Sequence, residues 1–191
     1  MSSISLNSVG FSWPRRIDAF AVVSADGMIA DADGARPEAF RRVAAQWQAG
    51  LADADVIVHG RHSQADGADD RHRILVTHRT EAIAADLARE KTYLWNPAWA
   101  PFDAAWRTLA VPNGSLAVAG GTRVFGLFLA IGYDRFELFQ APQIRLPGGR
   151  PLFPEVPTLG VEDVLARHGL RPGRTRHLDG GMTHVTWERS R

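Results

Sequence analysis

A chain of 191 residues is long enough for roughly one domain with its own hydrophobic core. It has 45% hydrophobic and 23% charged residues, a net charge of +1 and no cysteine. This composition excludes a disordered chain, and the lack of cysteine excludes a disulfide framework, a cysteine zinc site and a cysteine nucleophile. No basic cluster predicts nucleic-acid binding, and no apolar run approaches the roughly 20 residues of a membrane helix. We therefore expect a cytoplasmic protein that binds neither nucleic acid nor membrane.

Residues 1–16 are predicted to be a polar leader, because they lack the continuous apolar segment of a secretory signal. Residues 17–191 are predicted to form a single domain. Within it, short apolar runs alternate with amphipathic segments, which is typical of an α/β domain. The pattern predicts strands over 17–24, 55–59, 74–77, 93–95 and 115–119, and helices over 37–51, 81–90, 102–109 and 122–131. In the helix expected over 81–90, Ile83 and Leu87 would face the core.

The pattern changes after residue 131. A strand is expected over 135–140, and two more, over 174–178 and 183–188, flank Asp179-Gly180-Gly181, which is a hairpin signature. The chain thus begins with strand–helix units and ends in antiparallel strands. It predicts a mostly parallel central sheet with an antiparallel C-terminal hairpin.

The strongest local signal lies over residues 115–132, where a strand leads into Gly120-Gly121 and then directly into a helix. Two glycines let the backbone approach a ligand closely, and a helix N-terminus offers N–H groups and the positive end of a dipole. This combination indicates a phosphate or pyrophosphate site. The segment matches neither G-x-G-x-x-G nor a Walker A loop. A tight turn without a ligand explains the segment by itself equally well.

Two more polar turns follow predicted strands, at Gly60-Arg61-His62-Ser63 and at Thr77-His78-Arg79-Thr80. Arginine and hydroxyl groups at such positions suit contacts with anions. Because the carboxyl ends of parallel strands share one edge of a sheet, the three turns would lie together. Three anion-binding turns along one edge are suited to a dinucleotide.

The order of these motifs resembles the dihydrofolate reductase-like superfamily, and most of all the reductase domain of the bacterial bifunctional deaminase–reductase of riboflavin biosynthesis. The resemblance spans residues 17–188. It is carried by Ser24-Ala25-Asp26-Gly27-Met28-Ile29-Ala30, Val58-His59-Gly60-Arg61-His62-Ser63, Ile74-Leu75-Val76-Thr77, Val118-Ala119-Gly120-Gly121, Ala141-Pro142 and Gly148-Gly149-Arg150-Pro151-Leu152-Phe153.

The resemblance implies a three-layer fold and an NADPH-dependent reductase that transfers a hydride to a pteridine-like or pyrimidine-like heterocycle. It implies cofactor contacts at the pyrophosphate from Ala119, Gly120, Gly121, Thr122, Arg123 and Val124, and at the phosphates from Gly60, Arg61, His62 and Ser63. It places Thr77, His78 and Arg79 at the adenosine 2′-phosphate and Val22, Ile29 and Ala30 at the nicotinamide. Relatives of the riboflavin type commonly pair, so a homodimer is expected. Its apolar interface would come from Phe136, Leu138, Phe139, Ile144 and Leu146.

The proton donor is not evident from the sequence. The folate enzymes have a carboxylate early in the first helix, and Glu38 lies in that region, but a solvated first-turn acid that complements the helix dipole explains Glu38 better. Asp26 is a rival, although an aspartate in such a turn more often bonds its own backbone. True dihydrofolate reduction and an inactive nucleotide-binding module stay open as alternatives. The seven histidines form no metal-binding pattern, so no metal is expected.

Overall fold

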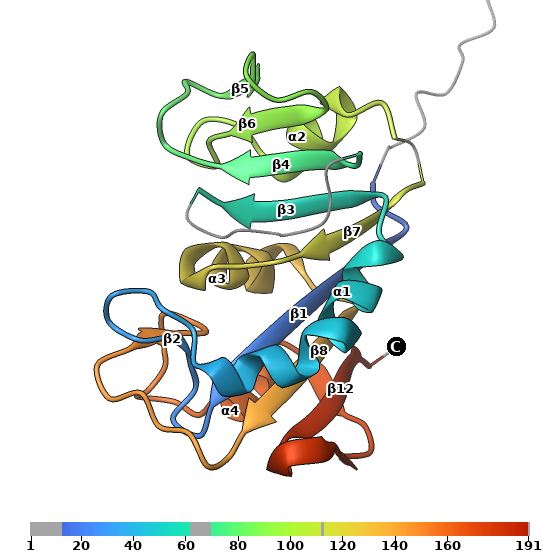
Figure 1. Ribbon diagram of the computed structural model, residues 1–191. Coiled ribbons are helices and arrows are strands. Elements are labelled where there is room, and N and C mark those ends of the chain that lie inside the picture. The colour runs from blue at the N-terminus through green and yellow to red at the C-terminus, as the bar shows by residue number, and fades with distance from the viewer. Residues whose placement is uncertain (1–12, 62–69, 112, 191) are drawn as a thin grey trace, which may run out of the picture.

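A central sheet of ten strands forms the middle of the computed structural model, which describes residues 13–61, 70–111 and 113–190 (Figure 1). In spatial order its strands are β10 (Leu170–Pro172), β12 (Thr183–Arg189), β8 (Arg135–Ala141), β1 (Arg16–Ser24), β7 (Ser115–Val118), β3 (Val56–Gly60), β4 (His72–Val76), β6 (Thr92–Trp95) and β5 (Ile83–Ala85), with β11 (Arg176–His177) beside β12. A small second sheet pairs β2 (Met28–Ala30) with β9 (Arg150–Pro151).

The middle of the large sheet is parallel and both of its edges are antiparallel. β1 runs parallel to β7 and β8, and the parallel order continues through β3, β4 and β6. β12 is antiparallel to β8 and pairs with β11 across the 3₁₀ turn η2 (Asp179–Gly181). The predicted parallel sheet with an antiparallel C-terminal hairpin is therefore confirmed.

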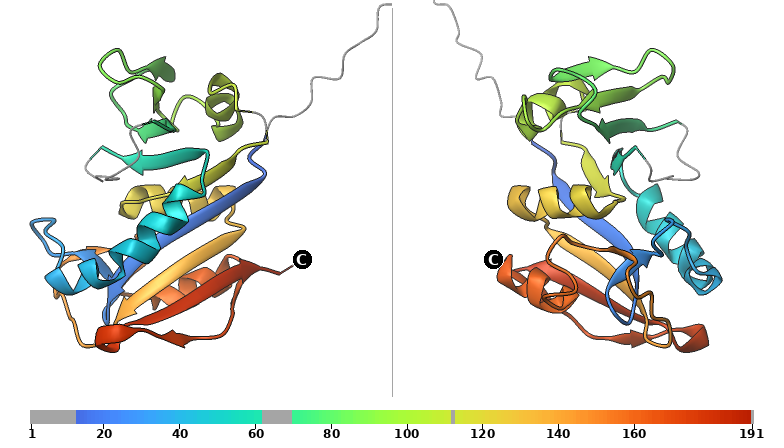
Figure 2. Two further views of the ribbon diagram at one scale, coloured as in Figure 1. Left: turned by 45° about the vertical axis from the view of Figure 1, so that its right-hand side comes forward. Right: turned by 90° about the vertical axis from the view of Figure 1, so that its left-hand side faces the viewer.

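Helices cover both faces of the sheet, which gives three layers (Figure 2). The 3₁₀ helix η1 (Glu38–Val43) and α1 (Ala44–Ala52) lie on one face. The other face carries α2 (Phe102–Thr108), α3 (Thr122–Ile131) and α4 (Val161–Arg167). The predicted helix over 122–131 is confirmed to the residue, whereas the one expected over 37–51 is divided between η1 and α1 at Val43 and Ala44.

The larger part of the core lies between the sheet and α2, α3 and α4, and aromatic rings dominate it. Phe128 of α3 is fully buried. Its ring centroid lies 5.2 Å from that of Phe102 and 6.3 Å from those of Trp95 and Tyr133. These contacts join α3 to α2 and to the end of β6. On the opposite face, α1 approaches β1 so closely that a Cβ at Gly50 would overlap the ring of Phe20.

The helix predicted over 81–90 is wrong. Residues 83–85 form β5, which pairs antiparallel with β6, and Leu87 is fully exposed instead of facing the core. The apolar spacing of Ile83 and Leu87 suggested a helix, but backbone pairing with β6 supplies the hydrogen bonds that decide the conformation. The sequence pattern also did not predict β2, β9, β10 and α4.

The predicted interface residues are mostly interior. Phe136, Leu138 and Phe139 are buried within the protomer, while Ile144 and Leu146 are half-buried. Side chains that already fill the core cannot also form an apolar interface between protomers. The homodimer itself stays a prediction. Among the tryptophans, Trp95 and Trp106 are core residues, whereas Trp99 is 75% exposed.

The predicted boundary between the leader and the domain lies at residue 16. Residues 13–16, predicted to belong to the leader, include Trp13, which packs edge-on against Phe102, and Arg16, the first residue of β1. The division into a leader and one domain stays a prediction.

Within the described residues, no helix is both long enough and apolar enough to span a bilayer.

Candidate functional site

A cleft opens where two neighbouring strands stop pairing. β1 pairs with β7 only as far as Ala19 and Val118, but it continues beside β8 to the pair Ser24 and Ala141. Beyond Ala19, β1 is therefore not paired with β7, at the edge where the parallel strands end. Crevices at the carboxyl ends of parallel strands are where α/β folds bind ligands.

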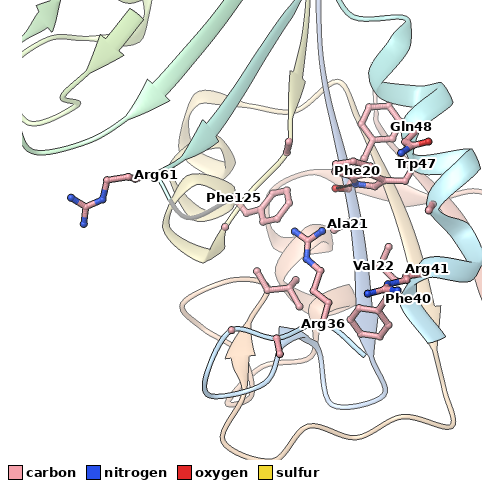
Figure 3. Close-up of a pocket in the computed structure, with 16 residues that line it drawn as sticks. Phe20, Ala21, Val22, Arg36, Phe40, Arg41, Trp47, Gln48, Arg61 and Phe125 are labelled. Atoms are coloured by element: carbon pink, nitrogen blue, oxygen red, sulfur yellow. Dashed lines mark hydrogen bonds between the residues drawn. The ribbon is translucent and has the colours of Figure 1, made fainter. Parts of the chain in front are cut away.

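The cleft has a volume of about 760 Å³ (Figure 3). Its wall is formed by side chains from β1, the segment after it, η1, α1 and the glycine turn. These residues are Phe20, Ala21, Val22, Ile29, Gly34, Ala35, Arg36, Phe40, Arg41, Ala44, Trp47, Gln48, Arg61, Ala119, Gly121 and Phe125.

One wall of the cleft is aromatic. Phe40 and Trp47 lie two helical turns apart on the same side of η1 and α1, and Phe20 faces them from β1. The indole Nε1 of Trp47 donates a hydrogen bond of 3.2 Å to the carbonyl oxygen of Phe20. This bond holds α1 against β1 beyond the last residue that β7 pairs. A flat heterocycle fits between such walls, because aromatic pairs favour stacked or edge-on contacts.

The charge on the cleft wall is positive. Arg36, Arg41 and Arg61 line it, and none of its described lining residues is an aspartate or a glutamate. Arg36 extends its guanidinium toward Phe125 and Ala21, whereas Arg61 points away from them (Figure 3). A wall of this kind favours an anionic ligand.

The predicted glycine turn borders the cleft and is held by its neighbour strand. The N–H of Gly60 donates to the carbonyl of Gly120 at 2.8 Å, and the Gly120–Gly121 peptide is cis. A Cβ at Gly60 would lie 3.8 Å from Gly120 O and Gly121 N, so a side chain there would stand beside this peptide. α3 begins at Thr122, and no described side chain caps its N-terminus. The glycine backbone at the cleft and the uncapped start of α3 fit a pyrophosphate group, which needs close backbone approach and N–H donors.

The residues that follow the glycines have different surroundings. The hydroxyl of Thr122 donates to the carbonyl of Pro151 and ties α3 to β9. The side chain of Arg123 is exposed at the start of the helix. Val124 is buried, and its N–H donates to Gly121 O. Val124 therefore supports the turn from inside, whereas neither Thr122 nor Arg123 lines the cleft.

The turn after β4 lies at the same sheet edge, outside the cleft. Thr77 is buried, and its N–H donates to Trp95 O at 2.9 Å. The hydroxyl of Thr77 accepts a hydrogen bond from the N–H of Arg79 at 3.2 Å. His78 and Arg79 are exposed, so both can meet a ligand phosphate.

The other predicted cofactor residues are distributed as follows. Val22 and Ile29 line the cleft, as does Arg61. Ala30 is buried in β2 opposite Arg150 and is not among the lining residues. His62 and Ser63 lie outside the described residues.

Neither predicted acid is placed as a proton donor. Glu38 has a side chain 81% exposed, is paired with Arg41 at 3.1 Å and does not line the cleft. Asp26 accepts hydrogen bonds from the hydroxyl of Ser24 at 2.6 Å and from the N–H of Leu146 at 3.0 Å. Burial raises the pKa of Asp26, but these bonds and the nearby Arg145 outweigh it, so that the pKa lies below its usual range. Asp26 is thus a carboxylate that joins two loops.

Sequence reasoning missed the basic and aromatic wall. A helical stripe such as Phe40, Ala44 and Trp47 is typical of a core-facing helix, but here these residues line the cleft. Arg36 and Arg41 carried no local signal, because only the packing of η1 against β1 brings them to the opening. Among the described residues, no group of three histidine, aspartate or glutamate side chains comes together that could hold a metal.

The chain is similar in structure to several solved proteins. A protein from Shewanella sp. PV-4 described as a riboflavin biosynthesis protein matches with a TM-score of 0.67 and 20% identity over 92% of this chain and 99% of its own. The diaminohydroxyphosphoribosylaminopyrimidine deaminase/5-amino-6-(5-phosphoribosylamino)uracil reductase of Thermotoga maritima matches with a TM-score of 0.64 and 12% identity over 93% of this chain but only 57% of its own.

A third similar structure is the dihydrofolate reductase of Enterococcus faecalis in complex with NADP(H) and RAB-propyl. Its TM-score is 0.62, at 14% identity over 94% of this chain and 99% of its own. No family model matches the sequence, and no curated protein does. At these identities the similarities show the fold, and the chain has the dihydrofolate reductase-like fold.

Proposed function

We propose that this chain, with its dihydrofolate reductase-like fold, is an NADPH-dependent reductase that transfers a hydride to a pyrimidine-like or pteridine-like heterocycle. The observation that carries the proposal is the adjacency of two features. A cleft with an aromatic wall opens directly beside the Gly120-Gly121 turn and the uncapped start of α3. One feature suits a flat ring and the other a pyrophosphate, as a reaction between a dinucleotide and a heterocycle requires.

The charge of the cleft favours a pyrimidine with an anionic substituent. Arg36 and Arg41 would bind that substituent, and Phe40 and Trp47 would hold the ring. The ion pair of Arg41 with Glu38 lies on the surface, where such pairs contribute little and can be exchanged. The phosphoribosyl pyrimidine in the name of the Thermotoga maritima enzyme belongs to this class of substrate. True dihydrofolate reduction is less well supported, because no described carboxylate lines the cleft.

NADPH, when bound, would supply the hydride, and the protein would position the reactants and exclude water. Gly120, Gly121 and Arg123 would hold the pyrophosphate, and Val22 and Ile29 would contact the nicotinamide. The proton that accompanies the hydride would come from water, since Glu38 and Asp26 are both unsuited to deliver it.

The test is the oxidation of NADPH by the purified chain with two substrates offered separately. We expect turnover with 5-amino-6-(5-phosphoribosylamino)uracil and little with dihydrofolate. Turnover of dihydrofolate alone would establish the folate-reducing alternative. Binding of NADPH without oxidation by either compound would indicate an inactive nucleotide-binding module.

Preference for NADPH over NADH should depend on the turn after β4. Replacing Arg79 with alanine should weaken NADPH binding by about 1.5–3 kcal/mol, the range for a hydrogen bond to a charged group, and leave NADH nearly unchanged. Fluorescence titration with each cofactor measures both constants. Equal losses for the two cofactors would contradict the position assigned to the 2′-phosphate.

Activity should survive the loss of the Glu38 carboxylate. Because Glu38 is exposed and outside the cleft, Glu38→Gln should retain activity within about tenfold of the unchanged chain. Steady-state rates at saturating NADPH and substrate give the comparison. A loss of roughly 10³-fold with substrate binding intact would make Glu38 the general acid.

A further inference from the structure

The buried amide of Asn96 connects two loops at the sheet edge where the adenosine end of the cofactor is proposed to bind. Asn96 follows β6 directly and is 3% exposed. Its Nδ2 donates to the carbonyl of Thr80 at 2.8 Å, and its own N–H donates to Ala82 O at 2.8 Å. Its Oδ1 accepts from the N–H of Ala98 at 3.2 Å and lies 3.3 Å from Nδ1 of His78.

These contacts determine how the histidine is presented. A backbone carbonyl can only accept, so the Thr80 carbonyl requires the Nδ2 side of the amide. The Oδ1 atom must then face Ala98 and His78. Because Oδ1 is an acceptor, the Nδ1 atom of His78 carries the proton and donates it. The Nε2 atom is the nitrogen left for a ligand, and it donates to a phosphate oxygen in the imidazolium, where both ring nitrogens carry a proton.

We propose that Asn96 is a positioning residue for NADPH preference, acting through His78 on the adenosine 2′-phosphate. This inference rests on the proposed function. Asn96 contacts no cofactor atom itself. It fixes the turn over residues 77–80 and the ring of His78, so that Nε2 of His78 and the guanidinium of Arg79 face the same phosphate. NADH lacks that phosphate and gains nothing from the arrangement.

The test compares NADPH and NADH affinities of the unchanged chain, Asn96→Leu and Thr92→Val. Leucine keeps the branching and the number of heavy atoms of the amide side chain, although it is larger, and it forms no hydrogen bonds. Thr92 is also buried in β6, at the opposite end, where its hydroxyl donates to Glu90 O. Thr92→Val therefore measures what the loss of a buried hydrogen bond does to this strand apart from the turn.

We expect Asn96→Leu to weaken NADPH binding by roughly tenfold and NADH binding by less than about twofold, since only the charge-assisted phosphate contacts are lost. Thr92→Val should leave the ratio of the two affinities unchanged. An unchanged ratio in folded Asn96→Leu, or an equal loss for both cofactors, overturns the proposal. So does an unchanged chain that binds both cofactors equally. An unchanged chain that binds neither cofactor refutes the proposed function itself.

A measurement on the unchanged protein keeps the proposal testable if Asn96→Leu does not fold. Nitrogen-15 NMR of the histidine rings distinguishes the two neutral tautomers. We expect the neutral ring of His78 to carry its proton on Nδ1, which is uncommon for a solvated histidine. The Nε2–H tautomer would show that Oδ1 of Asn96 does not hold the ring, and it would overturn the proposal.

Discussion

Replacing Gly121 with valine should lower the affinity for NADPH at least about tenfold, which corresponds to about 1.4 kcal/mol, while the fold is kept. Gly121 lines the cleft and precedes α3 with a φ of −81°, which a residue with a side chain can adopt. A valine side chain there would occupy the space proposed for the pyrophosphate. Titration of NADPH against intrinsic fluorescence, with circular dichroism for the fold, measures the effect.

The matched control is Ala130→Val, which places the same side chain at an exposed position near the other end of α3. It should bind NADPH as the unchanged chain does. If a folded Gly121→Val protein also binds NADPH normally, the pyrophosphate does not lie at this turn, and the assignment of the cofactor site is wrong.

Truncating Phe128 to alanine should lower the free energy of unfolding by about 3–5 kcal/mol, the usual range for a fully buried phenylalanine. The ring touches aromatic groups from three parts of the fold, so little of the resulting cavity can close. Urea denaturation followed by circular dichroism gives the difference.

Leu127→Ala, at the half-buried neighbour of Phe128 on α3, is the comparison. It should cost clearly less, because less apolar surface returns to water. Similar losses in the two variants would mean that the aromatic cluster is not the tightly packed part of the core.

The parallel strands could be predicted because each is a short apolar run followed by turn residues. Both signals are local, and the run from Ser115 through Gly121 into α3 contains them in full. The helix predicted around Leu87 was wrong because the conformation there is not decided by local signals. Its conformation depends on β6, and backbone pairing there overrides a weak helical spacing. α4 was recoverable, because Val161, Val164 and Leu165 have helical spacing and acidic residues occupy its first turn.

The candidate site likewise has one part that could be predicted from the sequence and one that could not. Its glycine and arginine turns follow strands directly, so their residue types and the rule for parallel sheets bring them to one edge. The cleft wall depends on where β1 loses β7, at Ala19, and on which side of η1 faces that gap. Neither can be read from the spacing of Phe40 and Trp47, since the same stripe would cover a closed sheet.

The position of β1 in the sheet has a consequence for how the protein is made. β1 is the first strand in the chain, yet both neighbours that flank it come on the order of 100 residues later, β7 from Ser115 and β8 from Arg135. Synthesis at roughly 5–20 residues per second leaves this apolar strand without a partner for several seconds on the ribosome. Such distant pairing also slows folding. The nascent chain therefore exposes a segment that is mostly buried in the finished protein, and any fragment that ends before Ser115 keeps it exposed as a site for aggregation or chaperone binding.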